Sequence, residues 1–104
     1  MSPRTLKGMK IKIELVKLKG GECEKCGYNV NLAALDFHHS NPNIKSKELK
    51  ISVLAVMNYE DILRELNKCE LLCANCHREA HNPNLQIDLI SQKIEELKVP
   101  TELI

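Results

Sequence analysis

With 104 residues the chain has room for one small domain, and its three aromatic side chains leave the core to leucine, isoleucine and valine. A net charge of +1 gives no overall signal for nucleic acid, although residues 1–25 carry seven cations against three anions, a balance that suits either a phosphate backbone or a solvated helix face. The first residues lack the apolar core of a signal peptide and no apolar run could span a bilayer, so we expect a cytoplasmic protein with no membrane partner.

The first predicted element is a basic amphipathic helix over about residues 5–18, ended by the glycine pair at 20–21. Its apolar residues recur at helical spacing: Leu6, Met9, Ile13 and Val16. Residues 23–28 follow as a tight turn, in which Gly27 leaves the backbone after the second cysteine unhindered. A short strand is predicted at residues 35–38.

The second half of the chain begins with a loop over residues 40–43, which the charged residues 45–50 continue. Asn58, with Asp61 as its capping-box partner, predicts the start of a helix over about 59–68. Residues 70–72 indicate a second short strand. A helix over residues 74–81 should end at the Asn-Pro pair that follows, and the periodicity predicts a final helix over about 86–98.

Four of the five cysteines form two Cys-x-x-Cys pairs with forty-six residues between them: Cys23, Cys26, Cys73 and Cys76. In a reducing compartment such pairs indicate a metal site, and four thiolates give zinc a tetrahedral sulfur cage. A structural zinc would join two distant segments and supply folding free energy to a small core. Redox-active thiols and buried apolar cysteines are the alternatives, and Cys69, outside the pairs, is predicted to be a core thiol.

All four histidines lie beside these pairs. His77 and His81 are four residues apart on a predicted helix, so they share one face and can chelate one ion. His38 and His39 are neighbours on a predicted strand and point to opposite sides, so one of them can join the helical pair. This arrangement would leave a three-ligand metal with open positions beside a free imidazole. Structural roles for single histidines, or a competing role for His77 at the cysteine site, are the alternatives.

A phosphodiesterase needs these parts. The metal neutralises a phosphate oxygen and stabilises the leaving 3′ oxygen. A histidine takes a proton from the attacking water, because its side chain titrates close to neutral pH.

Three segments carry a family resemblance: Cys-Glu-Lys-Cys-Gly, then Leu-Asp-Phe-His-His, then Leu-Leu-Cys-Ala-Asn-Cys-His-Arg-Glu-Ala-His. In order and spacing they resemble the HNH endonucleases, specifically small members with a four-cysteine zinc site. The resemblance covers about residues 23–81 and implies an α+β fold of the ββα-metal (His-Me finger) type, stapled by zinc. Residues 1–104 would then form a single HNH domain with flanking helices outside the motif, similar to phage, mobile-element and restriction enzymes.

The resemblance also implies roles for the histidines. Carried over by position, His38, His77 and His81 hold one divalent catalytic ion, which could be Mg²⁺, Mn²⁺, Ni²⁺ or Zn²⁺. His39 is the general base for hydrolysis of DNA phosphodiester bonds, which leaves 5′-phosphate and 3′-hydroxyl ends.

The family's central asparagine, which orients the base, has no direct match in this sequence. The expected position, about five residues before Cys73, holds Lys68. Asn67, one residue away, is the preferred catalytic candidate, and Asn75 lies inside the second cysteine pair. If neither serves, a backbone carbonyl could hold His39.

Candidate DNA contacts are Arg78, Lys68 and Lys45. Arg78 can bind phosphate through two hydrogen bonds, or pair with Glu79 on the same helix. Asp36 shares a strand face with His38 and could reach the metal through water or accept a local hydrogen bond.

The sequence is also compatible with other functions and assemblies. Cutting both DNA strands would favour a homodimer or two encounters. The competing function is a non-catalytic, zinc-ribbon-like nucleic-acid-binding module, which explains the cysteines and leaves the histidines without a role. A thiol redox protein is a third alternative.

Overall fold

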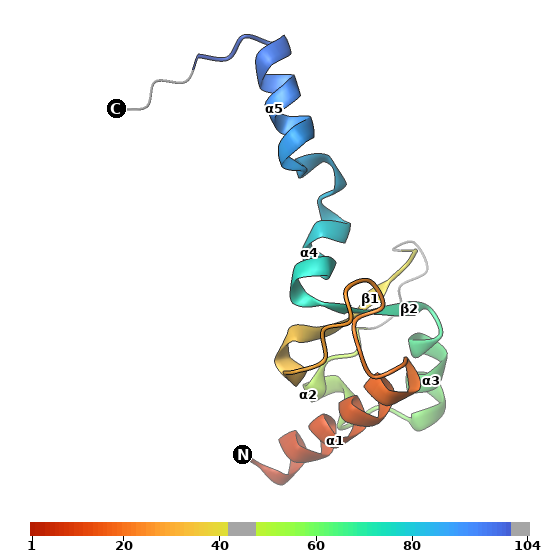
Figure 1. The fold of residues 1–104 in the computed structure, drawn as a ribbon. Helices are drawn as coiled ribbons and strands as arrows, with labels where there is room; N and C mark the ends of the chain where they lie inside the picture. The colour runs from red at the N-terminus through yellow and green to blue at the C-terminus, as the bar shows by residue number, and fades with distance from the viewer. Residues whose placement is uncertain (42–47, 101–104) are drawn as a thin grey trace.

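The computed structural model describes residues 1–41 and 48–100. Its elements are α1 (Pro3–Leu18), β1 (Leu35–His39), α2 (Ile51–Leu54), α3 (Tyr59–Leu66), β2 (Cys69–Cys73), α4 (Ala74–His81) and α5 (Ile87–Glu96) (Figure 1). Short 3₁₀ turns occupy Leu32–Ala34 and Pro83–Leu85. The described chain therefore has the predicted α+β class, with helices around one two-stranded antiparallel sheet.

The first helix starts earlier than predicted and ends as predicted. Ser2 Oγ accepts a hydrogen bond from the Thr5 N–H at 3.1 Å, and Pro3, in the first turn, has no N–H to satisfy. At the other end Gly20 and Gly21 have φ angles of 102° and 80°. These angles let the Gly21 N–H reach the carbonyl of Val16 at 2.8 Å, which closes the helix.

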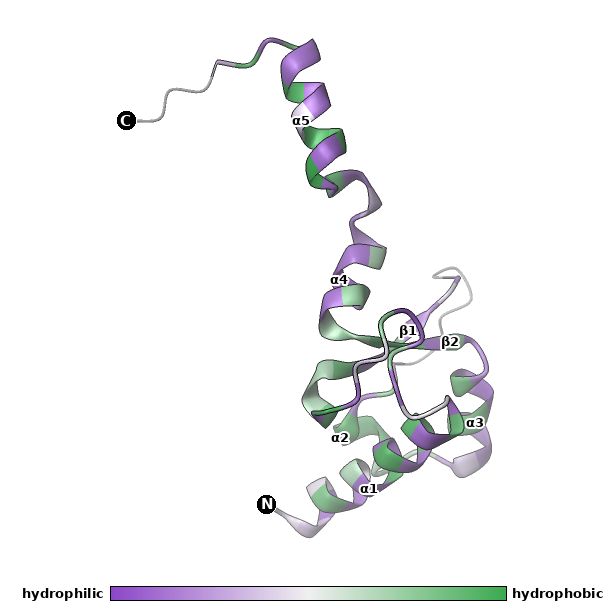
Figure 2. Cartoon of the chain, viewed as in Figure 1, coloured by the Kyte–Doolittle hydropathy of each residue, from purple (hydrophilic) through white to green (hydrophobic). Residues whose placement is uncertain are grey.

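The core forms where α1, α2 and α3 meet, in the part of the body where Figure 2 shows hydrophobic residues on these three helices. The buried residues of this cluster come from all three helices, from the segment before α2 and from the start of β2: Leu15, Leu49, Leu54, Ile62, Leu66 and Cys69. Cys69 is 4% exposed, so the prediction of a core thiol is confirmed. α2 was not predicted, because four residues are too few to show a helical period.

The sheet pairs β1 with β2, so that Leu35 lies opposite Cys73 and His39 lies opposite Cys69. β2 runs directly into α4, and Cys73 caps that helix, its Sγ accepting from the Cys76 N–H at 3.3 Å. The second cysteine pair therefore sits at a strand-to-helix junction. Because β2 ends at Cys73 and α4 begins at Ala74, no loop separates the strand from the helix.

One of the two contacts predicted for the N-terminal cap of α3 is present. Asn58 Oδ1 accepts a hydrogen bond from the Glu60 N–H at 2.7 Å, which confirms the predicted N-cap. The carboxylate of Asp61, however, pairs with Arg64 at 3.0 Å. Asp61 therefore supports the helix surface in place of the predicted capping-box contact.

The last helix, α5, extends away from the rest of the molecule (Figure 1). None of its residues is buried, and the radius of gyration is 18.0 Å, against ~13 Å for a compact domain of this length. α5 is shorter than predicted, because Lys98 adopts a left-handed φ of 51° just after its end. Within the described residues, no helix combines the length and apolar character needed to cross a membrane.

Candidate metal centres

The two Cys-x-x-Cys pairs come together as predicted. Each of the four cysteines offers a sulfur atom, and these atoms lie within 4.8 Å of one another. The Sγ atoms of Cys26 and Cys73 are 3.6 Å apart, and all four thiols are free. Two sulfurs ~2.3 Å from one tetrahedral zinc would lie ~3.8 Å apart. The spacing therefore suits a metal ion such as zinc.

Backbone hydrogen bonds hold the first pair against the second. The Gly27 N–H donates to the Cys23 carbonyl at 2.9 Å, and Gly27 has a φ of 82° that favours glycine in this tight turn. The Glu24 N–H donates to the Leu71 carbonyl at 2.8 Å, and the Leu71 N–H donates to the Glu24 carboxylate. The turn is thus bound to the middle of β2, two residues before Cys73.

The thiols interact strongly with one another. Burial raises the pKa of Cys23, but backbone N–H groups, led by that of Cys73, outweigh burial and lower the pKa to about 6. The pKa of Cys76 is raised to about 12, first by its hydrogen bond with Cys73 and then by burial. The pKa shifts of Cys23 and Cys76 thus have opposite directions, and a bound cation would favour the thiolate form of both.

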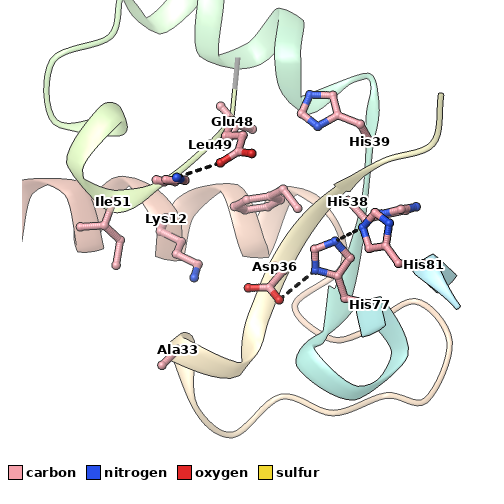
Figure 3. Close-up of a pocket in the computed structure, with 12 residues that line it drawn as sticks. Lys12, Ala33, Asp36, His38, His39, Glu48, Leu49, Ile51, His77 and His81 are labelled. Atoms are coloured by element: carbon pink, nitrogen blue, oxygen red, sulfur yellow. Dashed lines mark hydrogen bonds and ion pairs between the residues drawn. The ribbon is translucent and has the colours of Figure 1, made fainter. Parts of the chain in front are cut away.

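Three imidazoles form a second group, with His38 on β1 and His77 and His81 on α4 (Figure 3). Their ring centroids are 4.8 to 5.0 Å apart, and Nε2 of His77 lies 3.1 Å from Nε2 of His81. Two nitrogens ~2.1 Å from one tetrahedral ion would be ~3.4 Å apart. The predicted grouping is confirmed, and its spacing is compatible with a bound metal. His77 belongs to this group and lies outside the cysteine cluster.

Asp36 orients one of these rings. Its Oδ2 lies 3.0 Å from Nδ1 of His77. Of the two roles that the sequence left open for Asp36, the structure thus shows the hydrogen-bond acceptor. A neutral imidazole carries one proton, and a proton on Nδ1 leaves the Nε2 lone pair facing the other two rings. Partial burial, and then the charges of His77 and His81, lower the pKa of His38. A lowered pKa keeps that ring neutral, as a metal ligand must be.

The Asp36→Ala variant is expected to bind Ni²⁺ or Co²⁺ at the three histidines 10- to 100-fold more weakly, because His77 loses the partner that fixes its tautomer. Isothermal titration of zinc-loaded protein measures this affinity. Asp88→Ala, which removes an exposed carboxylate from α5, is the control and should bind as the wild type does. Equal affinities in Asp36→Ala and wild type would contradict this role for Asp36.

His39 lies on the other side of β1 from His38, as predicted for neighbours on a strand. It is 8% exposed, and its Nε2 is 3.1 Å from Oε2 of Glu65 on α3. Glu65 was not singled out from the sequence. The predicted orienting residue, Asn67, is exposed at the end of α3, where its N–H donates to the Leu63 carbonyl at 3.1 Å. The other candidate, Asn75, donates to Glu79 at 3.3 Å.

A cleft of about 560 Å³ connects these groups. The four histidines and Asp36 line it together with residues of α1 and α2, among them Lys12 and Ile51 (Figure 3). Lys12 Nζ donates to the Leu32 carbonyl at 2.9 Å. Burial lowers the pKa of Lys12 below its usual value, and the charge of Asp36 offsets this only in part. A lysine side chain therefore lies in the wall of the same cleft as the three imidazoles.

The predicted DNA contacts differ in their settings. Arg78 is exposed on α4 and has no ion pair within the residues that the structure describes. Lys68 is bound to Glu65, with its Nζ 3.1 Å from Oε1. Lys45 lies outside the described residues. Arg78 is thus the exposed candidate; it follows His77 in the sequence but is not among the residues that line the cleft.

Fold and site together define a small α+β protein with a four-cysteine group and a three-histidine group, both compatible with metal binding. No protein-family model matches the chain, and comparisons with curated proteins and with solved structures gave no significant match.

Proposed function

We propose that the chain is a metal-dependent endonuclease of the HNH type, which hydrolyses phosphodiester bonds of DNA. One observation carries the proposal: three imidazoles converge at a cleft whose wall contains a fourth, His39, from the next position on β1. A structural zinc alone would leave these four imidazoles without a role, because four thiolates already complete a tetrahedral site. The HNH-like motifs of residues 23–81 support the same assignment.

In this proposal the four cysteines hold a structural zinc, while His38, His77 and His81 hold one divalent ion, Mg²⁺, Mn²⁺, Ni²⁺ or Zn²⁺. The bound ion supplies positive charge to a phosphate oxygen and to the leaving 3′ oxygen. His39 takes a proton from the attacking water as general base. Arg78, exposed next to His77, binds a neighbouring phosphate. The products carry 5′-phosphate and 3′-hydroxyl ends.

Each chain offers one such centre and therefore cuts one strand at a time. Cleavage of both strands then requires a homodimer or a second encounter with the DNA. The net charge of +1 provides little general attraction to DNA, so contacts close to the cleft must hold the substrate.

Plasmid cleavage tests the proposal. Zinc-loaded protein is incubated with supercoiled DNA in EDTA, or with added magnesium, manganese, nickel or zinc. We expect metal-dependent conversion to nicked or linear DNA, and a loss of at least about 100-fold in His81→Ala, which removes one ligand of the divalent ion. Gln92→Ala on α5 is the control and should cleave normally. A folded, zinc-loaded protein that binds DNA and cleaves under none of these metals would instead be the non-catalytic binding module.

A further inference from the structure

We infer that Glu65 positions His39 and takes the part that the family gives to an asparagine. The inference rests on the proposed function, because it adds a residue to the same site. Oε2 of Glu65 lies 3.1 Å from Nε2 of His39, and the two side chains are 5% and 6% exposed. This contact joins α3 to β1 across twenty-six positions of the chain.

If this position served only to pack the core, a buried carboxylate would be less favourable there than an apolar side chain. α3 buries Glu65 together with Ile62 and Leu66, so the residue occupies a core position of an amphipathic helix. Replacing a buried polar pair with apolar residues of similar volume is often neutral or stabilising, since charged groups lose hydration on burial. A buried Glu65 is therefore better explained by what it does to His39 than by stability.

Both oxygens of the carboxylate have partners. Oε2 meets His39, and Oε1 lies 3.1 Å from Nζ of Lys68, whose side chain is 27% exposed. The ammonium group favours the ionised carboxylate, which can only accept hydrogen bonds. Lys68 stands where the family pattern expects the asparagine, and it acts on His39 through Glu65.

An ionised Glu65 determines which tautomer His39 adopts. In the neutral ring, Nε2 must carry the proton and donate a hydrogen bond to Oε2, which leaves Nδ1 with its lone pair. Within residues 1–41 and 48–100 no hydrogen bond occupies Nδ1, and the ring lines the cleft. A general base needs such an unprotonated nitrogen, held in a fixed orientation by a third group. Glu65 is thus a positioning residue that acts through His39.

The experiment compares Glu65→Leu and Glu65→Gln with Glu60→Gln, a control that removes an exposed carboxylate from the same helix. Three properties are measured: plasmid cleavage, Ni²⁺ affinity of the three histidines, and the His39 tautomer by ¹⁵N NMR of the ring. Glu65→Leu should cleave about 100-fold more slowly than wild type, and its His39 ring should no longer be held as the Nε2–H tautomer. Its Ni²⁺ affinity should not change. Glu65→Gln can still accept from Nε2–H, so it should keep the tautomer and cleave within about tenfold of wild type.

An Nδ1–H tautomer in wild type would overturn the inference, and so would a folded Glu65→Leu protein that cleaves normally. Should Glu65→Leu fail to fold, Glu65→Gln decides: a retained tautomer with retained cleavage supports the positioning role, and a retained tautomer with lost cleavage overturns it. Wild type that cleaves under no metal would contradict the proposed endonuclease. The wild-type tautomer would then still test Glu65, since Nε2–H supports its hold on the ring and Nδ1–H overturns it.

Discussion

The Cys76→Ala variant is expected to be unfolded even in the presence of zinc, and removal of the metal by a chelator is expected to unfold the wild type. Structural zinc contributes about 10–16 kcal/mol of apparent free energy in small zinc-finger peptides near neutral pH. A whole domain is stable by only about 5–15 kcal/mol. Loss of the proposed structural zinc therefore removes an amount comparable to the entire stability.

The packing around the cysteines indicates how strongly this region would depend on the proposed zinc. The buried cluster here consists of three of the cysteines and Leu72, with Tyr28 and Ala80 packed against it. Most of the buried side chains in this cluster are proposed zinc ligands, and Tyr28 of the first cysteine turn also packs against Val16, Leu35 and Leu71. The larger cluster around Leu15 and Leu54 lies between the helices and is built separately.

Circular dichroism and measurement of bound zinc test this prediction. Cys69→Ala is the matched control, because Cys69 is a buried thiol outside the two pairs. It should keep one zinc and a cooperative transition, with a loss of roughly 1–2 kcal/mol from the small cavity. A Cys76→Ala protein that melts like wild type would contradict the four-cysteine staple.

Local signals in the sequence were sufficient for most of the elements. The second cysteine pair and the Asn-Pro stop predict the bounds of α4 at Ala74–His81, and the structure has the same bounds. Asn58 and the glycines at 20–21 predict a helix start and a helix end correctly, because capping depends on a few neighbouring residues. α2 carries no such signal in its four residues.

Local geometry predicts that one of the two strand histidines can join the helical pair, and the family resemblance identifies it as His38. A helix places His77 and His81 on one face, and a strand separates His38 from His39, whatever the rest of the fold does. The closeness of the two cysteine pairs followed from chemistry, since one zinc needs four ligands. Neither inference requires knowledge of how the helices pack.

The partner of His39 could not be predicted in this way, because it depends on how α3 packs on β1. Glu65 and His39 are twenty-six positions apart, and proximity in sequence to the expected asparagine pointed to Asn67. One signal was present: Glu65 interrupts the apolar stripe that Ile62 and Leu66 form on the predicted helix. A charged residue in such a stripe is rarely buried without a partner, so it indicates a buried polar contact.

The His39→Ala variant is expected to lose DNA cleavage by about 10²- to 10⁴-fold, the range that general bases contribute. The zinc content and the Ni²⁺ affinity of the three histidines should not change, because His39 lies across β1 from His38. The same truncation also removes the hydrogen-bond donor of Oε2 of the buried Glu65, while Lys68 still contacts Oε1, and the lost hydrogen bond would lower stability by roughly 1–3 kcal/mol. Reduced activity in this variant alone would therefore mix a chemical effect with a structural one.

The His39→Gln variant separates the two effects. Its amide N–H can still donate to Glu65, so the protein should melt close to wild type and bind both metals normally. Glutamine cannot accept a proton as imidazole does, so cleavage should be as low as in His39→Ala. The measurements are plasmid cleavage and thermal denaturation of both variants beside wild type. A His39→Gln protein that cleaves at the wild-type rate would show that His39 is only a structural link between β1 and α3, and the base would have to be sought elsewhere in the cleft.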